Sequence, residues 1–309
     1  MRLHRRRAAG GSAARRPLRR RGRPPRHCRD GRGRHRRVGA ASRGDGVRPR
    51  DARFWALVVA IGLASGFLAG LFGVGGGILM VPALVLLLGV DQRLAHGTSL
   101  TAIIPMALVG VTGYALGDSV DWLAAALLTL GAAGGAVIGT AALHRLPERA
   151  LRLAFAVFLI LTATRMFFEV GEPVGDPHLG LATAVLLVVV GVVSGVTAGL
   201  FGVGGGLIMV PAMVLLLSLS DALAKGTSLA VIVPTALIGT YRNARCRNTD
   251  LTLAAVLGVS GMLTAFAASQ WSVTMDPSLS RITFACLMLV VAALMIFRKR
   301  ADAEPGLEA

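Results

Sequence analysis

One stretch of the chain occurs twice, 129 positions apart. Of the 46 residues from 65 to 110, 30 are identical to their counterparts without a gap. The longest identical run covers nine residues: Ala69 to Gly77 is identical to Ala198 to Gly206 at every position. A duplication of this extent predicts two copies of one structural unit, so the fold has to accommodate both copies in one molecule.

Residues 54–309 hold 13 basic and 13 acidic residues, and their apolar residues fall into long blocks with short polar breaks between them. Most blocks have 18–22 residues, which is enough for a helix to cross a hydrocarbon core of about 30 Å. We therefore expect an all-α polytopic membrane protein rather than a soluble enzyme. The blocks lie near 54–73, 77–90, 94–116, 122–143 and 150–169, and again near 180–201, 206–219, 223–241, 251–271 and 281–297.

The chain divides into four expected parts: a basic extension (1–53), a first membrane repeat (54–170), a second (180–298) and a polar tail (299–309). The extension holds 20 basic and 3 acidic residues and few aliphatic ones, so we expect it to be disordered. It could be an arm that binds anionic lipid headgroups or nucleic acid, or a transit peptide. The third interpretation is that the start codon has been assigned too far upstream, so that the extension is not translated. We favour the last and expect no nucleic-acid partner.

The loop charges predict how the two copies lie in the membrane. After the third block the first copy has Asp118 and Asp121, whereas the second has Arg242, Arg245 and Arg247. Positively charged loops stay in the cytoplasm, so equivalent loops of the two copies favour opposite sides. This indicates two inverted-topology repeats, as in secondary transporters, with both termini in the cytoplasm of a bacterial cell and a site at the midplane.

Each copy carries four glycines within five positions next to one of its short blocks. Glycine costs a helix interior about 1 kcal/mol relative to alanine, so each cluster predicts a broken helix and a short helix hairpin. The restarting helix has free N–H groups at its N-terminus, where a small anion binds well. Close helix packing is the alternative for these glycines, and it is the reading we favour for Gly66–Gly70 and Gly195–Gly199. The expected anion ligands are Gly75, Gly76, Gly77, Gly204, Gly205 and Gly206, with Gly73, Pro82, Gly202 and Pro211 shaping the breaks.

A Thr-Ser pair follows each short block. The hydroxyls of Thr98 and Ser99, and of Thr227 and Ser228, either cap the next helix or donate to a bound oxyanion. His96 and Lys225 precede these pairs at equivalent positions. They either attract anions or carry a proton, or they are plain charges of an interfacial loop, which is the reading we favour.

The membrane blocks hold no paired carboxylates and no nucleophile with a base beside it. Cys28, Cys246 and Cys286 lie far apart and form no metal-binding pattern. We therefore expect no enzymatic activity, no cofactor and no metal.

Two copies of Gly-x-Phe-Gly-x-Gly-Gly-Gly-x-x-x-Val-Pro, each followed by Gly-Thr-Ser-Leu and a proline, resemble the TauE/SafE sulfite exporter family of anion permeases. The resemblance covers residues 54–297. It implies a plasma-membrane permease of about eight spans in which the two short blocks fold back as half-helices. It also implies export of sulfite, organosulfonates or related sulfur-containing anions, coupled to the proton gradient. The alternatives are an uncoupled anion channel or a permease for a different small solute, and the oligomeric state is left open.

Overall fold

The computed structural model describes residues 51–142, 180–201, 204–245 and 248–301, together with 157, 159–161, 163 and 164. The contacts divide the chain after Arg36, and all the described residues belong to the second unit. Their regular structure is helical throughout. The helices are α1 (Ala52–Phe72), α2 (Gly77–Leu86), α3 (Gln92–Ala115), α4 (Trp122–Ala142), α6 (Leu181–Phe201), α7 (Gly206–Leu217), α8 (Asp221–Arg245), α9 (Leu251–Thr274) and α10 (Pro277–Ala301).

Six of the helices in the described ranges are long and apolar enough to cross a membrane. The expected all-α polytopic membrane fold is therefore confirmed. α2 and α7, at 10 and 12 residues, reach only about 15–18 Å at 1.5 Å per residue and are too short to span. The candidate spans are Ala52–Phe72, Leu94–Ala115, Leu181–Gly199, Asp221–Arg245, Leu251–Thr274 and Pro277–Leu294.

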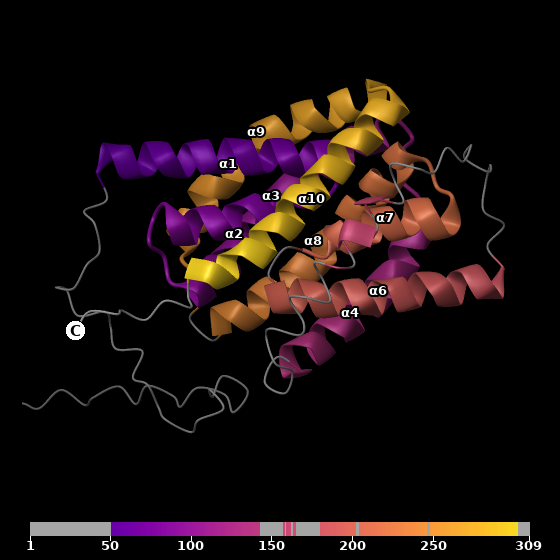
Figure 1. Ribbon diagram of the computed structural model, residues 1–309, viewed down its shortest axis with the longest axis horizontal. Coiled ribbons are helices and arrows are strands. Elements are labelled where there is room, and N and C mark those ends of the chain that lie inside the picture. The colour runs from indigo at the N-terminus through magenta and orange to yellow at the C-terminus, as the bar shows by residue number, and fades with distance from the viewer. Residues whose placement is uncertain are drawn as a thin grey trace, which may run out of the picture. The chain divides into compact units, whose positions relative to one another are not determined.

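The long helices of the two halves are exchanged. α1 of the first half packs along α9 of the second, and α6 of the second half packs along α4 of the first. Figure 1 shows these two pairs with α3 and α8, which contact each other, between them. The pairs of helices that pack between the halves recur with the halves interchanged, since α1 with α9 and α3 with α9 correspond to α6 with α4 and α8 with α4. This is the property of a two-fold relation.

Glycines allow this close pairing. A Cβ atom at Gly66 of α1 would lie 2.0 Å from the carbonyl oxygen of Gly261 in α9. At the equivalent Gly195 of α6 it would lie 2.2 Å from the carbonyl oxygen of Ala132 in α4. The packing role expected at Gly66 and Gly195 is therefore present, and any side chain at these two positions would push the paired backbones apart.

Candidate functional site

The first glycine cluster ends α1 and begins α2. Gly73 closes α1 with a φ of 69° and donates its N–H to the carbonyl oxygen of Ala69. Gly75 and Gly76 follow with φ values of 81° and 72°, and Gly76 is the N-cap of α2. These backbone angles are strained for any residue with a Cβ atom, so the break depends on glycine at these positions.

The second cluster repeats this geometry. Gly204 and Gly205 have φ values of 89° and 82°, and Gly205 is the N-cap of α7. Neither Gly76 nor Gly205 has a side chain that could cap its helix, so the first N–H groups of α2 and α7 have no acceptor within the helix. Gly77 and Gly206 are the first residues of these helices and are buried. Gly202 lies outside the described residues.

The two breaks lie against each other. A Cβ atom at Gly206 would be 2.7 Å from the carbonyl oxygen of Gly73 and 2.8 Å from Cα of Val74. Positions Gly75 and Gly204 both face the side chain of Ile232 in α8. The structure thus brings the glycines of both copies together in the interior, beside an apolar side chain.

The prolines are the sixth residues of the two short helices, Pro82 in α2 and Pro211 in α7. Proline has no N–H group, so the carbonyls of Ile78 and Leu207, four residues earlier, lack their usual helical donors. The first turns of both helices therefore hold fewer internal hydrogen bonds than an ordinary helix of this length.

The threonines of the two Thr-Ser pairs bond across the halves. The backbone N–H of Asp250, the N-cap of α9, donates to Oγ1 of Thr98 at 3.1 Å. The backbone N–H of Asp121, before α4, donates to Oγ1 of Thr227 at 2.9 Å. Both threonines lie in the second turn of their own helices, α3 and α8. The sequence interpretation in which each threonine caps the helix that contains it is therefore wrong. These helices begin earlier than their apolar blocks do.

The serines of the two pairs differ. Oγ of Ser228 donates to the carbonyl oxygen of Gly73 at 2.9 Å, which ties α8 to the first break. Oγ of Ser99 is fully buried and has no hydrogen-bond partner in the described part of the chain. A buried hydroxyl without a partner costs free energy unless something else binds it.

Two further serines belong to the site and were missed from the sequence. Ser65 in α1 and Ser194 in α6 are equivalent and fully buried, and neither Oγ has a partner within the described ranges. A Cβ atom at Gly76 would lie 3.3 Å from Cβ of Ser65, and one at Gly205 would lie 2.9 Å from the carbonyl oxygen of Ser194. A buried serine whose hydroxyl has no partner in the described ranges therefore lies beside the N-cap of each short helix. Their identity in the two copies was visible in the sequence, but serines among apolar residues are equally typical of helix packing.

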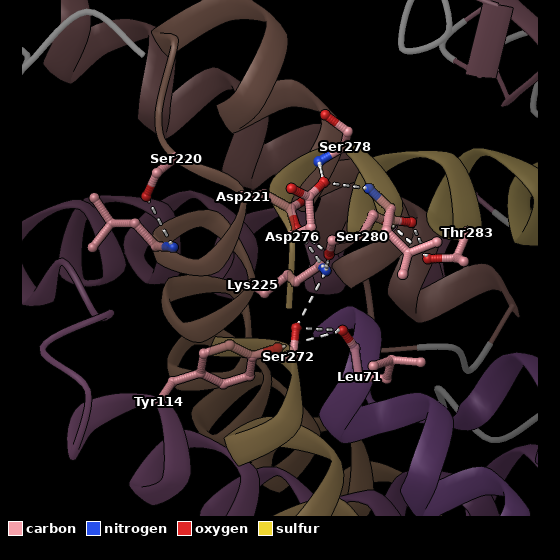
Figure 2. Close-up of polar contacts among 12 residues, drawn as sticks. Leu71, Tyr114, Ser220, Asp221, Lys225, Ser272, Asp276, Ser278, Ser280 and Thr283 are labelled. Carbon is pink, nitrogen blue, oxygen red and sulfur yellow. Dashed lines mark hydrogen bonds and ion pairs between the residues drawn. The ribbon is translucent and has the colours of Figure 1, made fainter. Parts of the chain in front are cut away.

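Lys225 is not the interfacial loop charge that the sequence favoured. It lies in α8 with no exposed surface, and Nζ is 2.7 Å from Oδ2 of Asp221, one turn earlier. Figure 2 shows Nζ also bonded to Ser280 of α10 and to Ser272 of α9. Ser280 in turn donates to Asp221. A buried ammonium needs such partners because unpaired burial of a charge is costly.

This ion pair touches the first glycine break. A Cβ atom at Gly73 would lie 2.7 Å from Cα of Lys225, and Nζ is 5.7 Å from the ring centroid of Phe72 at the end of α1. The first half has Gln92 and His96 at the positions of Asp221 and Lys225. His96 lies in α3 and is half-buried. The buried ion pair therefore breaks the symmetry of the two halves.

The charges expected in the loop after 223–241 lie on a helix instead. α8 continues through Arg242 and Arg245, which occupy its last turn. The guanidinium of Arg245 lies 4.3 Å from the ring centroid of Tyr241. Arg247 lies outside the described residues.

The sequence model of the family described as "Sulfite exporter TauE/SafE" matches residues 11–166 and 187–308. The match thus begins within the basic extension, earlier than the resemblance over 54–297.

Several curated bacterial proteins are similar to the chain. A "Probable membrane transporter protein" of Xylella fastidiosa (strain 9a5c) is 29% identical over 255 residues, which are 80% of this chain and 97% of that protein. The "Probable membrane transporter protein YunE" of Bacillus subtilis (strain 168) is 29% identical over 206 residues, 59% of this chain and 76% of that protein. No solved structure matches the chain significantly.

Proposed function

Because the chain belongs to the TauE/SafE sulfite exporter family, we propose that it is a secondary transporter that exports small sulfur-containing anions such as sulfite or organosulfonates. Its relatives are named membrane transporters, and transport across the membrane is the activity that the chain shares with them. The substrate class, the direction and the mechanism are our proposal.

The observation that carries the proposal is the pair of helix N-termini at Gly76 and Gly205. Each short helix begins at a glycine with positive φ, and the first residue of α7, Gly206, lies against the first break at Gly73 and Val74. Free N–H groups and the positive end of each helix dipole favour a small anion there. The partnerless hydroxyls of Ser65, Ser99 and Ser194 add donors suited to sulfonate or sulfite oxygens.

The proposed mechanism is alternating access between two inverted halves. The exchanged helix pairs and the reciprocal bonds of Thr98 and Thr227 support a two-fold relation, and inverted-topology transporters place such an axis in the membrane plane. Arg242 and Arg245 at the end of α8 favour the cytoplasm, whereas Asp118 follows α3. With this orientation both termini lie in the cytoplasm of a bacterial cell.

We propose protons as the coupling ion. His96 of α3 and Lys225 of α8 occupy equivalent positions, and Lys225, paired with Asp221, lies against the first break. A group that exchanges a proton while the halves move would couple the gradient to anion export.

A flux assay in liposomes tests the proposed function. Purified protein should carry labelled sulfite or a sulfonate down its gradient, and a proton gradient of the correct sign should accumulate it. The panel should include sulfate, thiosulfate and a taurine-like sulfonate, because these differ in size and charge but share oxygen acceptors. No flux of any anion would refute the proposal. A conductance that no proton gradient drives would replace it with the uncoupled channel.

A further inference from the structure

A cavity of about 40 Å³ lies between α8, α6 and the second glycine break. It has room for a few water molecules. Thr235, Arg242 and Asn243 contribute its polar side chains, and Gly204 lines it as well. The cavity therefore connects an arginine in the last turn of α8 with the residue just before the N-cap Gly205.

The equivalent region of the first half is filled by side chains. Met106 and Tyr114 stand at the positions of Thr235 and Asn243, and neither has any exposed surface. Met106 packs on α9 so closely that a Cβ atom at Gly261 would lie 2.1 Å from its Cε atom. The hydroxyl of Tyr114 donates to the carbonyl oxygen of Gly70 at 2.8 Å.

Gly70, which accepts the hydrogen bond of Tyr114, allows the two halves to be compared at one position. Its equivalent in the second half is Gly199, which lines the open cavity. The same surface of the same helix thus faces a cavity in one half and the phenol of Tyr114 in the other. Since Gly70 and Gly199 occupy equivalent positions of the repeat, we attribute the difference to the buried side chains of Met106 and Tyr114, which occupy this space in the first half.

We propose that these regions are the two vestibules of the transporter, one open and one closed. This rests on the proposed transport function. The open vestibule admits a small oxyanion past Arg242 to Gly204 and the N-terminus of α7. The closed vestibule is sealed by Met106 and Tyr114, which have to leave their places on Gly261 and Gly70 before an anion can pass on the other side.

The side chains of the open vestibule suit such an anion. A guanidinium binds the oxygens of a planar or tetrahedral oxyanion in a bidentate manner, and it remains charged at any physiological pH. Apolar residues, among them Leu100, Ala198 and Ile238, line the rest of the cavity. Its polar wall consists of an arginine, an asparagine and a threonine of α8, which suit an anion and water better than a lipid tail.

Cysteine labelling tests the proposal independently of transport. Ala236 lines the open vestibule, and Ala107 is its equivalent on the closed side. Both side chains are buried, so a reagent reaches position 236 only through the cavity beside Arg242 and Asn243. In a protein with serine at 28, 246 and 286, Ala236→Cys and Ala107→Cys form a matched pair. We expect a charged, membrane-impermeant methanethiosulfonate to label Ala236→Cys at least about tenfold faster, because a minor open state holds at most about 10% of the population.

Two variants should open the closed side. Tyr114→Asn or Met106→Thr, each of which introduces the residue of the other half, should raise the labelling rate of Ala107→Cys and leave that of Ala236→Cys unchanged. Either variant suffices if the other fails to fold.

The inference is overturned if Ala107→Cys reacts as fast as Ala236→Cys in the parent protein. It is also overturned if Ala236→Cys reacts only with a lipophilic maleimide, since the cavity is then filled by lipid. If labelling is as expected but liposomes show no anion flux, the vestibules stand and the proposed substrate fails.

Discussion

Oγ1 of Thr98 lies 3.1 Å from the backbone nitrogen of Asp250, and 129 positions further along the chain Thr227 makes the same bond to Asp121. Each bond joins a helix of one half to the start of a helix in the other. The hydroxyl accepts at the N-terminus of a long helix, where backbone N–H groups need acceptors.

Thr98→Val and Thr227→Val should therefore each destabilise the protein by about 0.5–1.5 kcal/mol, because a half-buried backbone N–H loses its acceptor. Thermal unfolding in detergent measures the loss. Thr274→Val is the control, because Thr274 is exposed and its hydroxyl donates to the carbonyl oxygen of Trp271 in its own helix, with no bond to the other half among the described residues. Equal midpoints for all three variants would show that the bonds between the halves contribute nothing.

Gly76→Ala and Gly205→Ala should abolish anion flux while the protein still inserts. A left-handed backbone costs a residue with a Cβ atom about 1–3 kcal/mol, and the new Cβ at Gly76 would lie 2.4 Å from the carbonyl oxygen of Ser65. Gly89→Ala is the matched control: Gly89 has a φ of 66° but nothing within 4 Å of a new Cβ. If Gly76→Ala transports as well as Gly89→Ala, the N-cap of α2 is not part of the anion site.

Ser65→Ala and Ser194→Ala should weaken anion binding without loss of stability. These hydroxyls have no partner in the described part of the chain, so their removal breaks no bond of the protein. A hydrogen bond to a charged group contributes about 1.5–3 kcal/mol, so we expect the apparent KM for the transported anion to rise at least about tenfold.

Thr264→Val separates this effect from simple destabilisation. Thr264 donates to the carbonyl oxygen of Leu63 at 2.7 Å, so the loss of its hydroxyl should lower the unfolding midpoint and leave KM near that of the parent. An unchanged KM in both Ser65→Ala and Ser194→Ala would return these serines to a packing role.

Asp221→Asn should destabilise the protein by about 3–5 kcal/mol, because it leaves the buried ammonium of Lys225 without its counter-charge. The double variant Asp221→Asn with Lys225→Met removes both charges and should recover most of the loss. Unfolding of the single and double variants in detergent tests this. A double variant as unstable as Asp221→Asn would mean that the pair is not the source of the stability.

Much of the fold was readable from the sequence because apolar blocks longer than about 18 residues have few other solutions. The positions of α1 and α9, and the shortness of α2 and α7, agree with the blocks. The sequence did not predict that α1 packs on α9 and α6 on α4. In a duplicated sequence a helix could pack equally well on its neighbour in the same half or on the equivalent helix of the other half.

The sequence predicted the glycine breaks of the site, but it did not predict the positions of all the polar side chains around them. Glycine clusters predict a break through backbone energetics alone, which are local. The burial of Lys225 depends on Ser272 and Ser280, which lie 47 and 55 residues away. A local signal did exist, since Asp221 precedes Lys225 by one helical turn, but the expected block began at 223 and left Asp221 outside.

The exchanged helices also bear on how the protein is made. Thr264 in α9 donates to the carbonyl oxygen of Leu63 in α1, a residue 201 positions earlier. During synthesis α1 therefore lacks its packing partner α9, and its glycine face is not covered by that helix until almost the whole chain has left the ribosome. We expect a nascent chain that stops before Leu251 to stay sensitive to membrane proteases, however well its separate helices insert.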